Sequence, residues 1–325
     1  MNGHAHVSLG ERLDARSEVV SGQTPICLRN DEAWGLLMNN ERPNILEKNE
    51  LDLDVQYNAR DTVTVDRFGS VMSEYRSRTA DAATILVCHS DIVYDDQSGQ
   101  KMDIYGAKDD LRPVFVFIHG GYWRALSKED SGFLAESLAA HGFVTVAIDY
   151  RLAPNVTLQE IVREVRASIK FLWLEGHRYG VDKNMIFVGG SSAGGHLAGC
   201  LLTDDWQNAL YVPLTIIKGA VLISGLLDLR PLRRTVVQTW LNLTESDAIT
   251  LSPALNLPAT GCHIIVAYAE HDPDGFKWQS QEFHRLWQRA GLPSTLMKLK
   301  DRDHFDCPLG LGDEVAKFMA TIVPH

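Results

Sequence analysis

A serine flanked by glycines is the first feature of the sequence that could do chemistry. Ser192 is the central residue of Gly190-Ser191-Ser192-Ala193-Gly194, between an apolar run at 185–188 and a stretch of helical period. Such a G-x-S-x-G turn from strand to helix raises the serine above a sheet, and the glycines avoid collisions at the sharp bend. We therefore predict Ser192 as a nucleophile. Ser191 is the competing serine, but it lacks the symmetric glycine spacing.

A serine hydroxyl is a poor nucleophile by itself, so an acid and a base should follow it along the chain. Asp272 follows the apolar run at 263–268, where the loop after a strand would aim a carboxylate across the top of a sheet. Glu270 and Asp274 are rivals two residues away, and each of the three could be only a solvated loop charge. We favour Asp272 because Pro273 can hold the turn directly after it.

His304 is the predicted general base, because it lies in the loop after the last apolar run of strand type, at 295–299. A loop histidine is usually a solvated surface residue, so order and position together carry this prediction. The other histidines that follow the serine fit less well: His196, His263, His271, His284 and His325.

A glycine pair follows the buried run at 113–118, in the motif His119-Gly120-Gly121-Tyr122-Trp123. Attack by a serine builds a tetrahedral oxyanion, and glycines at a strand end let backbone N–H groups approach it. Gly121 and Tyr122, with Ala193 after the nucleophile, are the predicted donors. The alternative is a tight turn beside a core histidine.

Aromatic side chains supply the candidate contacts to substrate. Within the glycine motif we predict Gly120, Tyr122 and Trp123 as substrate-binding residues, with an aromatic ring closing a small acyl pocket. Tyr57 and Trp240 could stack on an aryl ring, although simple core packing explains Trp240 equally well. Four arginines are candidate ligands for a substrate carboxylate by charge alone: Arg124, Arg230, Arg233 and Arg234.

The elements that must position these residues alternate along the chain from about residue 84 onward. The pattern predicts one α/β domain over residues 1–325, with a mostly parallel, roughly eight-stranded sheet and helices on both faces. Segments 1–80 and 226–260 fall outside the alternation, and we interpret both as covers over the strand ends; 1–80 includes a helical patch at 31–38. Expected strands are 84–88, 101–105, 113–118, 143–148, 185–188, 220–224, 263–268 and 295–299; expected helices are 127–141, one from 157, one after 192, 277–290 and 312–323.

Composition excludes several other classes of function. The 325 residues carry a formal net charge of −11 without a basic cluster, which argues against nucleic-acid binding. No apolar run approaches the roughly 20 residues of a membrane-spanning helix, and the first 18 residues resemble no targeting segment, so we expect a cytoplasmic protein. Five scattered cysteines and no zinc spacing predict neither disulfides, nor a metal, nor a cofactor.

The four elements in this order resemble the α/β-hydrolase fold. Within that fold the chain is similar to the kynurenine formamidase (arylformamidase) family through the glycine motif and the segments 53–60, 149–154, 192–198 and 303–306. The resemblance implies metal-independent hydrolysis of N-formyl-L-kynurenine to L-kynurenine and formate, in tryptophan degradation, by Ser192, Asp272 and His304. The alternative is a carboxylesterase for small aryl or alkyl esters. We expect a small-molecule substrate and leave the oligomeric state open, with a homodimer as one option.

Overall fold

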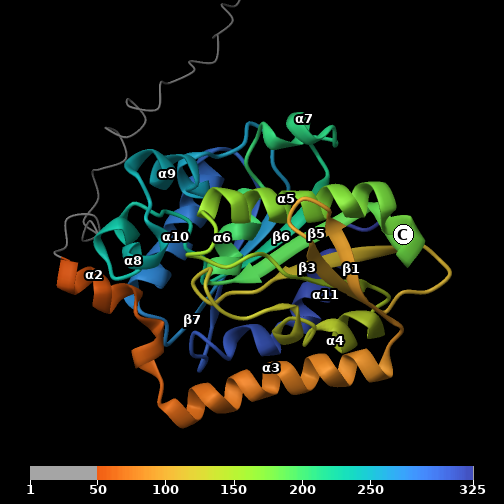
Figure 1. Ribbon diagram of the computed structural model, residues 1–325, viewed down its shortest axis with the longest axis horizontal. Helices are drawn as coiled ribbons and strands as arrows, with labels where there is room; N and C mark the ends of the chain where they lie inside the picture. The colour runs from red at the N-terminus through yellow and green to blue at the C-terminus, as the bar shows by residue number, and fades with distance from the viewer. Residues whose placement is uncertain (1–49, 325) are drawn as a thin grey trace, which may run out of the picture. The chain divides into compact units, whose positions relative to one another are not determined.

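The computed structural model describes residues 50–324, in which one sheet of eight strands forms the framework. The strand order across the sheet is β1-β2-β4-β3-β5-β6-β7-β8 (Figure 1). The strands are β1 (Cys88–Asp95), β2 (Gln100–Tyr105), β3 (Arg112–Ile118), β4 (Val144–Ile148), β5 (Val181–Ser191), β6 (Ile217–Ile223), β7 (His263–Ala269) and β8 (Ser294–Leu299).

Strands β3 to β8 pair in parallel, whereas β1 and β2 form an antiparallel hairpin at one edge, with β2 also antiparallel to β4. Parallel strands need crossover connections, so their carboxyl ends lie along one edge of the sheet. The predicted fold class is therefore confirmed.

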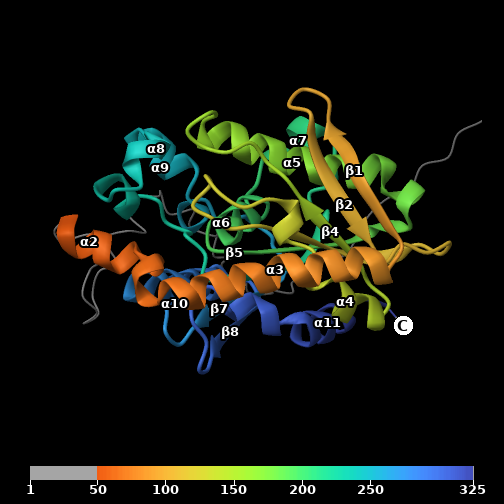
Figure 2. The same cartoon turned by 60° about the horizontal axis from the view of Figure 1, so that its bottom comes forward.

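Helices cover both faces of the sheet (Figures 1 and 2). The helices α5, α6 and α10 pack on one face, and α3, α4 and α11 pack on the other. The α-helices are α2 (Glu50–Tyr57), α3 (Val65–Ile85), α4 (Ala135–Ala140), α5 (Leu158–Glu175), α6 (Ala193–Cys200), α7 (Trp206–Leu210), α8 (Gln238–Leu241), α9 (Glu245–Thr250), α10 (Asp274–Arg289) and α11 (Gly312–Ala320). Short 3₁₀ turns are η2 (Ala59–Thr62), η3 (Lys128–Asp130), η4 (Gly176–Tyr179), η5 (Pro231–Arg234), η6 (Pro253–Leu255) and η7 (Cys307–Gly310).

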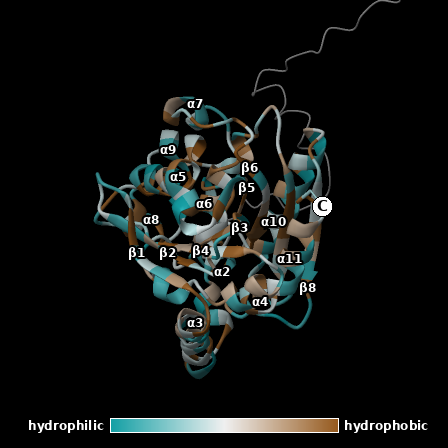
Figure 3. Cartoon of the chain, turned by 90° about the vertical axis from the view of Figure 1, so that its right-hand side faces the viewer, coloured by the Kyte–Doolittle hydropathy of each residue, from teal (hydrophilic) through white to brown (hydrophobic). Residues whose placement is uncertain are grey.

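The core has two layers because alternate side chains of a strand point to opposite faces. In β3, Val114, Val116 and Ile118 pack under α5 and α6, while Phe115 and Phe117 pack toward α3 and α4. The middle strands are accordingly coloured largely hydrophobic in Figure 3. Since both faces are covered, these strands are rigid supports for the loops at their ends.

The expected strand at 84–88 is wrong. Helix α3 continues to Ile85, and the N–H of Leu86 still bonds the Ala82 carbonyl at 2.9 Å. Ile85 and Val87 are 62% and 60% exposed, whereas Leu86 and Cys88 pack against the small core cluster that includes Tyr105. The strand begins at Cys88 and is more polar than expected, because it lies at the edge of the sheet.

The expected helix at 127–141 is interrupted. Only η3 and α4 are helical, and the chain between them leaves helical geometry. The N–H of Gly132 bonds the Thr79 hydroxyl at 3.0 Å, where a continuous helix would use a carbonyl four residues back. Gly142, two residues after α4, has φ of 84°, in the left-handed region that glycine adopts without strain. The expected helix start at Thr157 is confirmed, since its hydroxyl caps α5.

The helical patch expected at 31–38 lies outside the described residues. No helix within residues 50–324 is both long enough and apolar enough to cross a membrane.

Candidate active site

Ser192 lies at the turn between β5 and α6, at the carboxyl edge of the sheet. Its backbone is strained, with φ of 58° and ψ of −117°, and its N–H bonds the Ile223 carbonyl of the neighbouring strand at 2.8 Å. A Cβ on Gly194 would lie 1.9 Å from the Ile118 carbonyl oxygen, so only glycine fits there. This is the geometry that the pentapeptide predicted for a raised serine.

Asp272 and His304 meet across the ends of β7 and β8. The Nδ1 of His304 lies 2.6 Å from Oδ1 of Asp272, and both side chains are buried. Because the carboxylate accepts, Nδ1 carries the hydrogen and Nε2 presents its lone pair, which is the form that a general base needs.

Two further donors hold the Asp272 carboxylate. Its Oδ2 accepts from the Ser224 hydroxyl at 2.6 Å and from the Ala269 N–H at 2.7 Å. Ser224 directly follows β6 and is fully buried, with φ of 46°. Our sequence reasoning missed Ser224; the only available signal was a polar residue directly after an apolar strand.

Ser192 and His304 line the same cavity. Among the described residues no hydrogen bond joins their side chains, although each side chain lies within the walls of that cavity. Catalytic hydrogen bonds are often long before substrate binds. The structure thus places Ser192 and His304 on one cavity and Asp272 behind His304, with the acid–base contact already formed.

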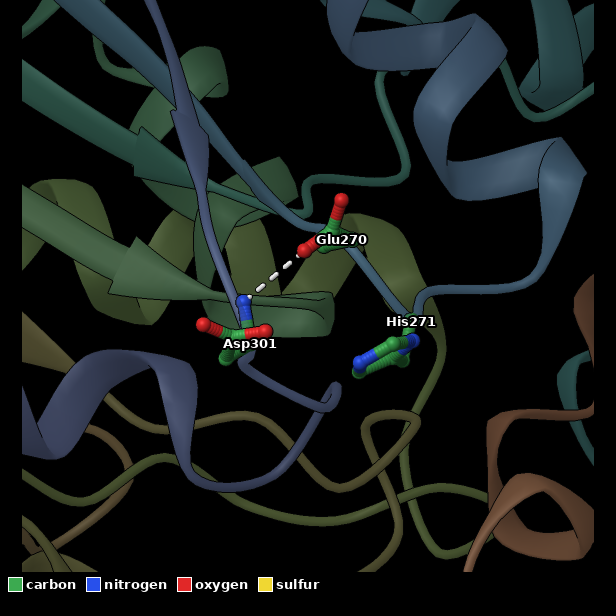
Figure 4. Close-up of side chains that lie close together, drawn as sticks. All are labelled: Glu270, His271 and Asp301. Atoms are coloured by element: carbon green, nitrogen blue, oxygen red, sulfur yellow. Dashed lines mark hydrogen bonds between the residues drawn. The ribbon is translucent and has the colours of Figure 1, made fainter.

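The rival acids are occupied elsewhere. Figure 4 shows Glu270 directed at the backbone of Asp301, whose N–H it accepts at 2.9 Å. Lys298 pairs with the other Glu270 oxygen at 2.6 Å, and these two contacts lower the pKa of Glu270 to about 2. Asp274 is exposed in the first turn of α10, where it pairs with Lys277.

His271 lies beside Glu270 and Asp301 in Figure 4. Among the described residues, its side chain makes no hydrogen bond with His304. These three side chains form the only group in residues 50–324 with metal-ligand spacing. The group lies on the surface, and its glutamate already has a lysine partner. It carries no part of the site.

Two of the predicted oxyanion donors, Gly121 and Tyr122, lie on the loop after β3, and the third, Ala193, begins α6. Residues 119–123, here named the oxyanion loop, include three successive residues of positive φ: Gly121 at 88°, Tyr122 at 50° and Trp123 at 59°. A Cβ on Gly121 would lie 2.4 Å from the Ala125 carbonyl, so a glycine is required. Within the described residues no hydrogen bond uses the N–H of Gly121, Tyr122 or Ala193, which leaves all three available as donors.

Tyr150 packs against the oxyanion loop and bonds its backbone. Its hydroxyl lies 2.9 Å from the His119 carbonyl and 3.1 Å from the Gly120 carbonyl, and its ring stacks on the His119 imidazole at 4.1 Å. Burial lowers the pKa of His119 to about 4, so this imidazole is neutral at pH 7. Tyr150 belongs to the segment 149–154, whose role sequence reasoning did not identify.

Trp123 lies outside the cavity lining, unlike the other residues predicted to bind substrate. It is fully buried, and its Nε1 donates to Nδ1 of His196 at 3.3 Å. Nε2 of His196 in turn donates to the Leu251 carbonyl at 2.7 Å. The structure therefore places Trp123 in support of the oxyanion loop rather than against a ligand.

The cavity has a volume of about 540 Å³. Gly120 lines it, and so do three aromatic residues that we proposed as substrate contacts: Tyr57, Tyr122 and Trp240. The Tyr122 hydroxyl donates to the Tyr57 carbonyl, and the Trp240 Nε1 donates to the Tyr122 carbonyl at 3.1 Å. The described part of segment 1–80 and segment 226–260 both contribute walls, within residues 54–75 and 235–240.

Helix α3 holds the loop that carries His304. Arg67 donates to Asp303 at 2.9 Å and to Asp306 at 2.6 Å, on either side of the histidine. The Tyr75 hydroxyl donates to the Phe305 carbonyl at 2.6 Å. An element far from the histidine in sequence thus fixes the position of the imidazole.

Comparison with known proteins gives the same picture. Residues 102–215 match the family model described as BD-FAE. A kynurenine formamidase of Danio rerio is 35% identical over 252 residues, which cover 75% of this chain and 83% of that protein. A kynurenine formamidase of Salmo salar is 36% identical over 224 residues, which cover 66% of this chain and 74% of that protein.

Solved structures agree on the fold. A putative thioesterase from Silicibacter superposes with a TM-score of 0.70 at 23% identity, covering 83% of this chain and 98% of its own. The carboxylesterase EstE1 superposes with a TM-score of 0.66 at 20% identity, covering 80% and 97%. By its fold and by these relatives, the chain is a hydrolase of the α/β-hydrolase class that belongs to the kynurenine formamidase family.

Proposed function

We propose that this enzyme hydrolyses N-formyl-L-kynurenine to L-kynurenine and formate, with Ser192, His304 and Asp272 as its catalytic residues. The observation that carries the proposal is that His304, bonded to the buried Asp272, lies in the wall of a cavity that also includes the strained Ser192. Family membership supports the choice of an aryl formamide as substrate.

The first half of the reaction uses the side chains in turn. Nε2 of His304 takes the Ser192 proton as the hydroxyl attacks the formyl carbon, while Asp272 holds the imidazole in the required tautomer. The N–H groups of Gly121, Tyr122 and Ala193 donate to the developing oxyanion, at about 3 to 4 kcal/mol each. The C–N bond then breaks, and His304 gives its proton to the departing arylamine.

The second half repeats the chemistry with water. His304 takes a proton from water, which attacks the formyl ester on Ser192, and formate leaves as the serine is reprotonated. Formyl is the smallest acyl group, so a wall close to Ser192 favours it over longer chains. Tyr122 is suited to that position because both ends of the residue are held. Its hydroxyl donates to the Tyr57 carbonyl, and its backbone carbonyl accepts from the Trp240 Nε1.

A small-ester carboxylesterase is the second candidate. Esterase LipC of Mycobacterium tuberculosis is 36% identical over 128 residues, or 38% of this chain, and the same catalytic residues would cleave an ester. The two candidates differ in the acyl group and in the leaving group, so rates on matched substrates separate them.

The test is kcat/KM for N-formyl-L-kynurenine beside p-nitrophenyl acetate and butyrate. We expect the formyl amide to be preferred, and Ser192→Ala to lower its kcat by roughly 10⁴- to 10⁶-fold. Ser191→Ala is the matched control for a neighbouring hydroxyl and should keep activity. Preference for the esters by orders of magnitude, with the same dependence on Ser192, would establish the carboxylesterase instead.

A cytoplasmic location is part of this proposal, and the four described cysteines, all free thiols, support it. Several expectations stay predictions: the substrate is a small molecule, no metal or cofactor is needed, and neither nucleic acid nor a membrane is a partner. The oligomeric state also stays open, with a homodimer as one option. Gel filtration with light scattering tests the last of these.

A further inference from the structure

The mouth of the cavity carries a cation held in place by an aromatic ring. The cavity opens where its lining residues are exposed, and Arg124 is one of these. Its guanidinium carbon lies 4.3 Å from the centre of the Trp240 ring. Within residues 50–324, no carboxylate pairs with this guanidinium and no hydrogen bond uses its N–H groups.

The position of Arg124 is fixed relative to the oxyanion loop. Its backbone N–H bonds the Gly121 carbonyl at 3.0 Å, which closes the turn after the loop. Trp240, beneath the guanidinium, is itself bonded to the Tyr122 carbonyl at 3.1 Å. A ligand whose carbonyl sits at the oxyanion donors therefore meets a preorganised cation at its other end.

The other arginines that the sequence offered are placed differently. Arg230 pairs with Asp228 at 2.7 Å, and Arg233 donates to the Leu243 carbonyl at 3.3 Å. Neither of them lines the cavity, and Arg234 does not line it either. Of the four candidates, only Arg124 reaches the space in which a substrate would lie.

A second cation lines the same cavity. Arg60 lines the cavity, with its guanidinium carbon 4.6 Å from the centre of the Phe68 ring, and one of its N–H groups is used by the Val63 carbonyl at 3.1 Å. It adds to the positive potential that Arg124 produces in the cavity. This local potential matters because the whole chain, at a formal net charge of −11, repels anions at long range.

Two carboxylates also line the cavity, and both have partners. Asp130 is buried and pairs with Arg76 at 2.8 Å, and Asp54 accepts the Val236 N–H on Oδ1 at 2.7 Å. Within residues 50–324 no hydrogen bond uses the second oxygen of Asp54, which can therefore attract an ammonium group. The mouth thus presents charges of both signs, as the head group of an amino acid requires.

From these contacts we infer that Arg124, stacked on Trp240, binds the carboxylate of an amino-acid substrate while the scissile formamide lies at Ser192. The inference rests on the proposed function and deepens it: it makes Arg124 the residue that distinguishes an amino-acid formamide from a neutral one. A guanidinium donates two parallel N–H groups to a carboxylate, which a lysine cannot reproduce fully.

The test compares two substrates that share the aryl formamide. N-formyl-L-kynurenine carries the amino-acid group, and N-(2-acetylphenyl)formamide lacks it. For Arg124→Gln we expect KM for the first to rise about 5- to 30-fold, with kcat nearly unchanged, and both constants for the second to stay within about twofold of wild type. Arg124→Lys should recover part of the loss.

Salt and a remote arginine provide controls. Added NaCl should raise KM of the wild type for the charged substrate and have little effect on Arg124→Gln, because salt screens an exposed ion pair. Arg178→Gln removes an arginine that is exposed and paired with Glu175, outside the cavity, and should change nothing. An Arg124→Gln enzyme that treats both substrates as the wild type does, or loses both equally, overturns the inference.

Binding measurements separate this inference from the proposed function. Calorimetry gives Kd for L-kynurenine and for 2-aminoacetophenone, its neutral counterpart, without any turnover. We expect Arg124→Gln to weaken only L-kynurenine, by about 5- to 30-fold. If the wild type cleaves neither formamide, the proposed function fails, and this comparison still decides the carboxylate site; equal Kd shifts for both ligands refute it.

Discussion

The Ser224→Ala variant tests whether catalysis depends on the hydrogen bond that Ser224 donates to Asp272. Three donors share the two oxygens of Asp272: His304 and Ser224 at 2.6 Å each, and the Ala269 N–H at 2.7 Å. A hydrogen bond to a charged group is worth about 1.5 to 3 kcal/mol. If the whole loss appears in the transition state, where His304 becomes positively charged, kcat falls about 10- to 150-fold at 1.36 kcal/mol per tenfold.

The assay is steady-state kinetics on the preferred substrate, with kcat and KM reported separately. KM should change little, because Ser224 lies behind Asp272 and does not line the cavity. Ser280→Ala is the matched control, since that hydroxyl is also fully buried but has no hydrogen-bond partner among the described residues. Wild-type kcat in Ser224→Ala, or an equal loss in Ser280→Ala, would refute the reasoning.

Three further perturbations act on the framework of the site. Tyr150→Phe removes the hydroxyl bonded to the His119 carbonyl, and we expect kcat to fall about tenfold with KM retained. Gly194→Ala brings a Cβ to 1.9 Å from the Ile118 carbonyl, so this variant should lose the cooperative thermal transition seen by circular dichroism. Burial lowers the pKa values of His119 and His196 to about 4 from 6.5, so the unfolded chain binds more protons in that interval. The free energy of unfolding, measured with urea, should be constant above about pH 6.5 and fall toward pH 4 by up to about 3 kcal/mol for each histidine. A stability that is flat over this interval contradicts the assignment of two neutral, buried imidazoles.

The sheet was predictable because its strands are buried on both faces. Unbroken apolar runs such as 113–118 and 263–268 identify such strands without help from distant residues. The five predicted helices follow in order, although the one at 127–141 is interrupted. The predicted strand at 84–88 failed because β-branched residues also occur on the exposed last turn of a helix. Propensity alone does not separate these two cases.

The positions of the candidate catalytic residues followed from chain order, whereas their support did not. The supporting contacts join residues that are far apart in sequence. The partners are 48 residues apart for Ser224, 31 for Tyr150 and 236 for Arg67. No local period or motif encodes a contact of that length. Trp123 illustrates the same limit, because only the structure shows that its indole is turned toward His196 and away from the cavity.

The contacts between helix α3 and the loop that carries His304 join an early and a late part of the chain. Arg67 and Tyr75 leave the ribosome among the first of the described residues, whereas Asp303, Phe305 and Asp306 leave it near the end. A nascent chain can therefore complete most of the sheet and the turn that raises Ser192 while it still lacks a general base. Hydrolysis requires the late loop that carries His304 to dock on helix α3, which is made earlier.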